Sequence, residues 1–477
     1  MKRTSTAKLS KLFILCTITL FSLNTASRKS MAEEIKITDI ENIGEALSEA
    51  EDNASKTNPY TISVQTGNYE LNEEINIPSY TTLNFEPGTK ISCDGISDNY
   101  AIRITSGTEN SAINGGTFQG AGIFVKDSEN ITIENVTVNN PSECGILVKG
   151  VNKQGSIKVN TVTNSKKFSI AFMGAEFDGN IEKNTITKSS DIALYLYNST
   201  LKGNISGNTI KNCQKTAIYA GGTPINGDIT NNTIKSVKGH GIGIYHGSHV
   251  NAIDSNNMDD IGGANNGGNG DCGIMINADE GSGKKAYPTY VKSITNNTIK
   301  NVTYSGIKLY AGPSGNDNSK ANQDKAYIKK DIKGNTLYNI GTYKHSKDWK
   351  KEIQKGGRFG AQVGIYLDSH SRVYGNICDN TITKSNLHGI YMRVGAVANN
   401  ITNNIITNVK EDGICINKAA KVNGSINNNK ITNAKVSGLC VRENSTVNKV
   451  SGNTFKQIGY KNITILDNSK IKKNSQK

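Results

Sequence analysis

Residues 179–210 read GNIEKNTITKSSDIALYLYNSTLKGNISGNTI and contain one full unit of a repeat that runs through the chain. An Asn-x-apolar triplet opens at Asn184 and again at Asn208, 24 residues later. A second mark, Gly-Ile followed by alternating apolar residues, usually comes nine residues after the Asn. The same triplet opens, mostly at intervals of 24 or 25, at Asn135, Asn160, Asn232, Asn257, Asn297, Asn335, Asn380, Asn404, Asn429 and Asn453.

Each repeat holds three short segments in which apolar residues alternate with polar ones. A spacing of two predicts strands and excludes a helix. Strands this short cannot bury an apolar face alone, so the chain must coil and pair each strand with its equivalent one turn later. The sequence therefore predicts an all-β parallel β-helix, a solenoid of about a dozen coils and roughly 60 Å. We expect the recurrent Asn residues to adopt the left-handed conformation at turns and to stack as a side-chain amide ladder.

The N-terminal part resembles a known superfamily. IGEALSEAEDNA (43–54) is similar to a short helix that caps the end of a solenoid, and residues 60–92, 113–118 and 129–138 are similar to first coils. The chain resembles the pectate-lyase-like superfamily of right-handed parallel β-helix proteins, and this resemblance implies a single-stranded right-handed parallel β-helix with an N-terminal capping helix. Because that fold hosts lyases, epimerases, hydrolases and non-catalytic adhesins, it does not choose a function.

The composition and the N-terminus predict a secreted protein. Residues 1–32 combine a basic start, the apolar run LFILCTITLF and small residues at a cleavage site, as in a signal peptide. Residues 33–477 would then form one β-helix domain, with an N-terminal cap at about 33–60. No later run is long enough to span a membrane. Seven scattered cysteines remain after the leader and do not predict a disulfide framework. Cys415 and Cys440 occupy equivalent repeat positions, where stacked buried or free thiols are expected.

The charge is compatible with an acidic partner. The formal net charge is +14, and removal of the leader's six basic residues leaves about +8. A basic excess outside the cell suits an acidic polysaccharide, although it also serves solubility. Nucleic acid is not expected, because no basic run is interleaved with aromatic residues. Nothing in the sequence indicates an oligomeric state.

Insertions break the repeat within 257–364 and lengthen the loops around the Gly-Ile strands. In those strands, the third and fifth residues are expected to face solvent. They form a stripe of rings and polar groups that predicts a groove for a long saccharide. Tyrosines stacked between coils would stabilise the sheet without any ligand, which is the structural alternative. The predicted substrate-binding residues are Tyr195, Tyr197, Tyr219, Tyr245, His246, Asn277, Tyr310 and Tyr391.

The segment GIYLDSHSR (364–372) carries the densest chemistry on this stripe. Removing the C5 proton of a uronate needs a cation for the carboxylate, a base and a proton donor. Lys308 or Arg393 would neutralise the uronate, His370 or Tyr366 would exchange protons, and Asp368 would orient an imidazole or bind the sugar. These five residues are the predicted catalytic set.

The same segment is similar to the Tyr-Gly-x-Asp-Pro-His signature of mannuronan C5-epimerases. Asp368 and His370 match its Asp-x-His part, whereas Ser369 replaces the proline and Tyr366 lies one place closer to the aspartate. The resemblance implies C5 epimerisation, and elimination by a polysaccharide lyase shares the same first step. A non-catalytic β-helix that binds glycans or a cell surface is the alternative.

Two further motifs suggest minor alternatives. GHGIGI (239–244) is similar to the Gly-His-Gly segment of polygalacturonases, but the coil before it has no carboxylate pair for hydrolysis. His240 is then a turn residue. Asp271, Asp279 and Glu280 crowd one insertion and are candidate ligands for Ca²⁺, with a solvated loop as the alternative. No other cofactor is implied.

Overall fold

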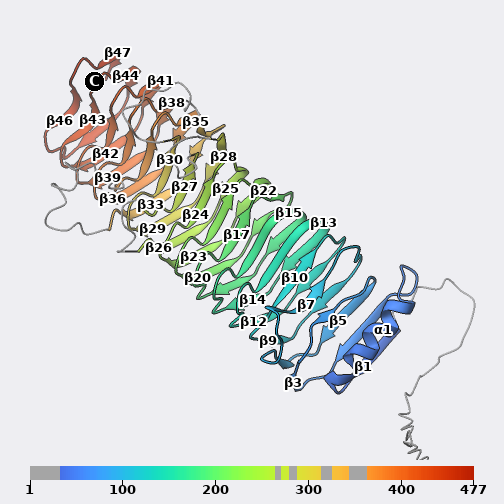
Figure 1. Cartoon of the computed structure of the whole chain (residues 1–477). Coiled ribbons are helices and arrows are strands. Elements are labelled where there is room, and N and C mark those ends of the chain that lie inside the picture. Colours follow the sequence, from blue (N-terminus) through green and yellow to red (C-terminus); the bar gives the residue numbers. More distant parts are fainter. Residues whose placement is uncertain (1–32, 264–269, 279–286, 313–324, 343–361, 477) are drawn as a thin grey trace, which may run out of the picture.

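The computed structural model describes residues 33–263, 270–278, 287–312, 325–342 and 362–476. These residues form a rod of parallel coils, shown in Figure 1. A 32-stranded sheet joins two of the three strand columns, and a 15-stranded sheet forms the third. At about 4.8 Å per coil, the 15 strands of the third column span roughly 70 Å. The predicted β-helix is confirmed, and it has more coils than the Asn repeat alone indicated.

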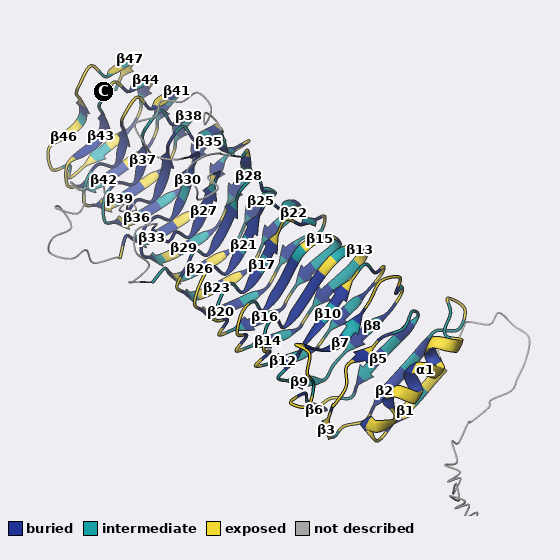
Figure 2. Cartoon of the chain, in the orientation of Figure 1, coloured by how far each residue is buried: buried dark blue, intermediate teal, exposed yellow. Residues whose placement is uncertain are grey.

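One end of the rod is closed by a short helical cap. Asp39 accepts a hydrogen bond from the Glu41 amide and starts the 3-10 helix η1 (Ile40–Asn42), which leads into α1 (Ile43–Asn53). The apolar residues of α1 recur at helical spacing and are buried, while its other face is exposed (Figure 2). The capping helix predicted at residues 43–54 is therefore confirmed. It covers apolar strand ends that would otherwise meet water.

The Gly-Ile column carries the strands that follow the Gly-Ile marks. Its strands pair in parallel from one coil to the next. They are β4 (Ile75–Asn76), β7 (Tyr100–Ile104), β10 (Gly122–Lys126), the first parts of β13 (Ile146–Lys158) and β15 (Ile170–Glu182), β17 (Leu194–Tyr197), β21 (Ile218–Gly221), β24 (Ile242–Tyr245), β27 (Ile274–Asn277), β30 (Ile307–Tyr310), β34 (Ile365–Asp368), β37 (Ile390–Met392), β40 (Ile414–Ile416), β43 (Ser437–Val441) and β46 (Lys461–Ile465).

The second column continues the same sheet after a short turn. It includes the later parts of β13 and β15. Its other strands are β1 (Glu33–Ile37), β2 (Tyr60–Val64), β5 (Thr81–Phe85), β8 (Ala112–Asn114), β11 (Thr132–Glu134), β18 (Thr200–Leu201), β19 (Ile205–Ser206), β22 (Pro224–Thr230), β25 (His249–Asp254), β28 (Thr289–Thr295), β31 (Ala326–Ile328), β32 (Ile332–Lys333), β35 (Arg372–Cys378), β38 (Val397–Thr402), β41 (Lys421–Asn427), β44 (Thr446–Ser451) and β47 (Lys470–Ser475).

The third column forms the 15-stranded sheet and completes each coil. Its strands are β3 (Asn68–Glu70), β6 (Lys90–Ser92), β9 (Thr117–Gln119), β12 (Thr137–Asn139), β14 (Thr161–Thr163), β16 (Thr185–Thr187), β20 (Thr209–Cys213), β23 (Thr233–Val237), β26 (Asn257–Ile261), β29 (Thr298–Val302), β33 (Thr336–Ile340), β36 (Thr381–Ser385), β39 (Ile405–Val409), β42 (Lys430–Ala434) and β45 (Thr454–Lys456).

One continuous apolar core runs along the axis of the rod. Isoleucines stack on isoleucines because equivalent residues of neighbouring coils are in register, as in Ile218, Ile242 and Ile274. These side chains are fully buried. Close packing of β-branched side chains on a pleated surface fixes the register, since a shift by one residue would turn each strand's apolar face outward.

The predicted asparagine ladder exists inside the turn between the second and third columns. Asn208, for example, donates from Nδ2 to Asn232 Oδ1 at 3.0 Å and to the Ile181 carbonyl at 2.9 Å. Two details of the prediction were wrong. Asn256, not Asn257, occupies the ladder, and Asn135 lies outside it. The left-handed residue is the one before the ladder Asn in each coil, such as Lys183 or Asn231.

Removing one ladder amide should destabilise the rod strongly. Asn232→Ala would leave the buried Asn208 amide and Ile205 carbonyl without partners, so we expect a loss of about 3 kcal/mol in the free energy of unfolding. Equilibrium unfolding in urea measures this change. Thr233→Ala, at the exposed next position, is the matched control and should cost under about 1 kcal/mol. Equal losses in both variants would contradict the structural role of the ladder.

Candidate functional site

The structure places four of the five predicted catalytic residues on three neighbouring rungs of the Gly-Ile column. Lys308 on β30 pairs in register with Tyr366 on β34, and Tyr366 pairs with Tyr391 on β37. Asp368 ends β34, and Arg393 follows β37 directly. The Arg393 amide donates to the Leu367 carbonyl at 3.0 Å, which fixes its guanidinium beside Asp368. Register of the coils thus brings together residues that are far apart in sequence.

The expectation that this stripe faces solvent was wrong for its central residues. Tyr366 and Asp368 are each only 2% exposed, and Tyr391 is 9% exposed. They do not point into the axial core. Tyr366 and Tyr391 form a separate outer cluster with Val363, and their rings stack at 5.4 Å between centroids. Strand alternation predicted the correct face of the sheet but not the packing on that face.

Asp368 is the centre of the polar contacts. The Tyr366 hydroxyl donates to Asp368 Oδ2 at 2.7 Å. Arg393 donates from Nε to Oδ1 at 2.8 Å and from Nη2 to Oδ2 at 3.3 Å, which is a two-point clamp. Burial and the adjacent Asp368 carboxylate raise the pKa of Tyr366 well above its ordinary value. Tyr366 is therefore a protonated phenol near neutral pH.

Arg393 was predicted to neutralise a substrate carboxylate, but in the structure it neutralises Asp368. The cation that remains on this surface is Lys308. Its Nζ lies 5.3 Å from the centre of the Tyr366 ring and 5.5 Å from that of Tyr310. Within the described parts of the chain, the contacts recorded for the Lys308 ammonium are with these two rings and not with a carboxylate.

His370 lies beyond the end of β34, in the turn to the second column. It has a positive φ of 59°, and its amide donates to the Val394 carbonyl at 2.8 Å. Its imidazole lies against Gly395, where an added Cβ would approach Nδ1 to 2.4 Å. The His370 imidazole therefore packs on the turn that follows β37. Its role as a base remains a prediction.

The predicted saccharide stripe is a stack of rings along the rod. Phe168 and Tyr195 are 4.2 Å apart between centroids, Tyr195 and Tyr219 5.4 Å, and Tyr219 and Tyr245 5.1 Å. All three pairs are close to parallel, so each ring covers the faces of its neighbours. Stacking of these faces on sugar rings, as predicted, is therefore blocked within the stack. The alternative role, stabilising the sheet, fits this geometry.

The other predicted binding residues occupy the fifth position of the Gly-Ile strands or the turn after it. Tyr197 is 42% exposed and is nearly parallel to Tyr195. Tyr245, Asn277 and Tyr310 follow one another in register, and Tyr310 is buried. His246 lies in the turn after β24, with its ring 5.5 Å from that of Tyr245. Together with Lys308 they offer hydroxyl, amide and ammonium groups.

The calcium hypothesis is not tested. Asp279 and Glu280 lie outside the described residues. Asp271 is buried before β27, and its carbonyl accepts a hydrogen bond from the Tyr304 amide at 3.2 Å. The hypothesis therefore stays a prediction.

His240 is a turn residue, as the sequence suggested. Its Nδ1 accepts a hydrogen bond from the Cys272 amide at 2.9 Å in the next coil. Burial, with a smaller contribution from Lys308, lowers its pKa to about 4. The imidazole is thus neutral at physiological pH and holds two coils together.

This histidine should make the rod sensitive to acid. Because the unfolded chain takes up a proton on His240 near its ordinary pKa of about 6.5 and the folded chain does not, stability should fall as pH drops from about 6.5 towards 4. Thermal unfolding across this range measures the effect. The fall should be smaller in His240→Asn, which has no titrating imidazole. An unchanged pH profile in that variant would contradict the assignment.

Sequence reasoning missed two groups. On the second column, His249, Tyr290 and Tyr327 form a second ring ladder with centroids 4.9 Å apart at each step. In the Gly-Ile column, Cys415 and Cys440 follow Tyr391 in register, beside buried His388 and Asp412. Equal spacing from coil to coil could have revealed the ring ladder, whereas His388 and Asp412 join the two thiols only through the bends of their turns.

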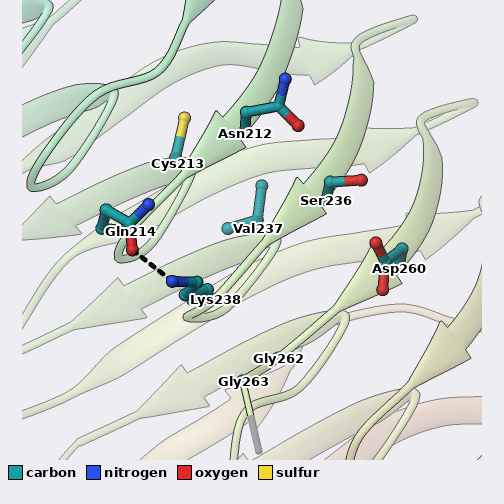
Figure 3. Close-up of a pocket in the computed structure, with 9 residues that line it drawn as sticks. All are labelled: Asn212, Cys213, Gln214, Ser236, Val237, Lys238, Asp260, Gly262 and Gly263. Carbon is teal, nitrogen blue, oxygen red and sulfur yellow. Dashed lines mark hydrogen bonds between the residues drawn. The ribbon is translucent and has the colours of Figure 1, made fainter. Parts of the chain in front are cut away.

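A cavity of about 340 Å³ lies elsewhere on the rod. It is formed where β20, β23 and β26 end, and Figure 3 shows the Lys238 Nζ donating to Gln214 Oε1 at 2.6 Å across its rim. Its other lining residues include Asn212, Ser236 and Asp260. These coils precede those that carry Lys308, Tyr366 and Arg393, so the cavity is separate from the candidate site.

Comparisons with known families agree with the coil architecture. Residues 94–258 match the family described as right handed beta helix region, and residues 314–475 match the family described as periplasmic copper-binding protein (NosD). Each match covers less than half of the chain. Among curated proteins, none matches. The part of the chain that the structure describes contains no helix that meets the length and hydropathy of a membrane span.

Solved structures with similar shape are distant. The catalytic domain of a GH87 alpha-1,3-glucanase is 13% identical, with 94% of this chain and 70% of that chain covered and a TM-score of 0.37. The tailspike protein of E. coli bacteriophage HK620 is 12% identical, with 91% and 76% covered and a TM-score of 0.46. The periplasmic alginate epimerase AlgG is 14% identical, with 78% and 76% covered and a TM-score of 0.40. At these values, none of them bears on the function of this chain.

The strand columns, their parallel register and the family match to residues 94–258 together define the class: this chain is a right-handed parallel β-helix protein.

Proposed function

We propose that the protein is an exported enzyme that removes the C5 proton of uronate residues in an acidic polysaccharide, acting as a lyase or a C5-epimerase. The observation that carries the proposal is the buried Tyr366 hydroxyl, which donates to Asp368 beside the Lys308 ammonium, while Arg393 holds Asp368 at two points. Export is supported by the predicted leader and by the match of residues 314–475 to a family described as periplasmic.

The roles follow from charge and protonation. Lys308 binds the uronate carboxylate and stabilises the charge that develops when the C5 proton leaves. His370 accepts that proton. Tyr366 exchanges its hydrogen bond to Asp368 for one to the substrate and supplies a proton. Asp368 and Arg393 keep the phenol in place.

Two outcomes follow from the same first step. In elimination, the C4–O4 bond breaks, O4 takes the proton from Tyr366, and a C4–C5 double bond forms. In epimerisation, the C4–O4 bond stays intact, His370 keeps the abstracted proton, and Tyr366 donates a different proton to C5 from the opposite face. A screen of alginate, pectate and glycosaminoglycans, with and without Ca²⁺, for ultraviolet-absorbing unsaturated products and for inverted uronates separates these outcomes.

A non-catalytic glycan-binding protein is the second candidate. It is favoured by one observation, the stack from Phe168 to Tyr245, which serves the scaffold without any chemistry. Binding of acidic glycans with neither product in the screen would select this candidate. Glycoside hydrolysis is less supported, because the carboxylate described at the site, Asp368, is already bound by Arg393.

Lys308 provides a test of substrate recognition. Lys308→Ala should lower kcat/KM by about 100-fold, because a buried substrate carboxylate would lose its counter-ion. Lys308→Arg should recover part of the loss. Lys300→Ala, an exposed position of the third column, is the matched control and should leave kcat/KM within about twofold. Equal activity of Lys308→Ala and the control would remove Lys308 from the site.

A further inference from the structure

Further along the Gly-Ile column, the outward-facing residue changes from a phenol to a thiol. Tyr391 pairs in register with Cys415, and Cys415 pairs with Cys440 on the next rung. Cys415 is fully buried and Cys440 is 3% exposed, and both are free of disulfides. Both side chains belong to the outer cluster that also contains Tyr366 and Tyr391. The fold therefore holds two thiols side by side.

A histidine and an aspartate lie close to Cys415, the first thiol of this pair. His388 and Asp412 directly precede the Gly389 and Gly413 marks of β37 and β40, and they are 5% and 2% exposed. His388 Nδ1 lies 3.5 Å from Asp412 Oδ2. One ligand atom each from His388, Asp412 and Cys415 all lie within 4.8 Å of one another. Cys415 and Cys440 lie on β40 and β43, and His388 and Asp412 lie in the short turns before β37 and β40.

Apolar packing does not explain this arrangement. Two stacked thiols pack well without polar neighbours, whereas a buried carboxylate is costly unless something compensates its charge. Asp412 accepts a hydrogen bond from the Ser437 amide on Oδ1 at 3.0 Å, and its Oδ2 faces His388. An imidazole and a carboxylate are both common metal ligands.

We propose that Cys415, Cys440, His388 and Asp412 bind one thiophilic divalent cation, and Zn²⁺ fits the donor set best. Two thiolates and a carboxylate bring three negative charges, which one divalent ion and the neighbouring Arg442 balance. Arg442 interacts electrostatically with Cys415, Cys440 and Asp412. The candidate catalytic residues are separate, so this site does not depend on the proposed function.

Binding needs a small contraction and a proton release. In tetrahedral zinc, ligand atoms lie roughly 3.3–3.8 Å apart, so the groups must approach by about 1 Å. Both thiols lose their protons to solvent as the two metal–sulfur bonds form. If His388 binds through Nδ1, the metal replaces the hydrogen bond that the Asp412 amide donates to that atom at 3.2 Å.

Co²⁺ titration of the reduced full chain tests the proposal, because bound thiolates give a charge-transfer absorption. We expect one Co²⁺ per chain, displaced by Zn²⁺. Cys415→Ala and Cys440→Ala should lose the absorption and bind Co²⁺ at least about tenfold more weakly. Cys213→Ala, which removes a buried thiol at the end of β20, is the matched control and should titrate as the parent does.

A parent protein without the thiolate absorption would overturn the proposal, as would an absorption that persists in both cysteine variants. X-ray absorption of the zinc-loaded parent protein needs no variant and covers the case in which a substitution prevents folding. It should show two sulfur neighbours, and a sulfur-free shell would contradict the site. Free thiols can also be blocked at lysis, so that the oxidation state of the cysteines is preserved. A Cys415–Cys440 disulfide found in that protein would overturn the metal-site proposal and would indicate a structural crosslink instead.

Discussion

Tyr366→Phe is expected to lower kcat on the uronate substrate by at least about 100-fold while the rod stays folded. The substitution removes one hydroxyl, the proton donor that Asp368 holds at 2.7 Å, and keeps the ring that stacks on Tyr391. KM should change little, because Lys308 still binds the carboxylate. Steady-state kinetics with the substrate found in the screen measures both parameters.

The control for this variant is Tyr338→Phe, which removes an exposed hydroxyl from the third column. Its kcat should stay within about twofold of the parent. Thermal unfolding of Tyr366→Phe should confirm a folded protein, since Arg393 still neutralises Asp368. A fully active Tyr366→Phe would show that the phenol is structural and would remove the proton donor from the proposed mechanism.

Arg393→Ala is expected to cost about 3 kcal/mol in the free energy of unfolding, the largest loss for any charged residue discussed above. Asp368 is almost completely buried, and without the guanidinium its charge loses a two-point partner. Urea unfolding measures the loss. The double variant with Arg393→Ala and Asp368→Asn should recover part of this loss, because it no longer buries an uncompensated carboxylate charge.

The matched comparison is the exposed ion pair of Lys215 and Asp191, with Nζ and Oδ2 2.7 Å apart between neighbouring coils. Lys215→Ala should cost under about 1 kcal/mol, since water and salt screen this pair. If Arg393→Ala cost no more than Lys215→Ala, the Asp368 clamp would be an ordinary surface contact. The four-variant cycle of Arg393 and Asp368 would then show no coupling energy.

The sequence predicted the solenoid because its repeat is local and periodic. The 24-residue spacing of Asn184 and Asn208 specifies which strands pair, and pairing in register then stacks equivalent residues from coil to coil. The shift from Asn257 to Asn256 arose because two asparagines are adjacent at that turn. The ladder position is decided by the left-handed residue before it, here Ser255, and serine carries no signal for that conformation.

The chemistry of the candidate site was less predictable than its location. Equivalent positions in neighbouring strands placed Lys308, Tyr366 and Tyr391 in one row. Alternation, however, distinguishes only the two faces of a strand, so it could not show that Tyr366 is buried on the outer face. Nor could it show that Arg393 is committed to Asp368, because a pairing between side chains depends on rotamers that the spacing does not determine.

The thiol pair shows the same limit. Cys415 and Cys440 were recognised as equivalent repeat positions, which is a property of spacing. His388 and Asp412 approach them from the turns before β37 and β40, and this approach depends on how the turn backbones bend. Three-dimensional placement is needed to join the four residues into one group.

The central claim, abstraction of a uronate C5 proton at the Tyr366 cluster, is tested most directly by solvent exchange. The purified protein is incubated with the acidic polysaccharides in D₂O, and NMR follows deuterium at C5 together with the unsaturated product. The account predicts that one polysaccharide acquires C5 deuterium or a C4–C5 double bond, and that Tyr366→Phe does neither at a comparable rate. Polysaccharides that bind to the protein yet keep their C5 protons and their chain length would contradict it.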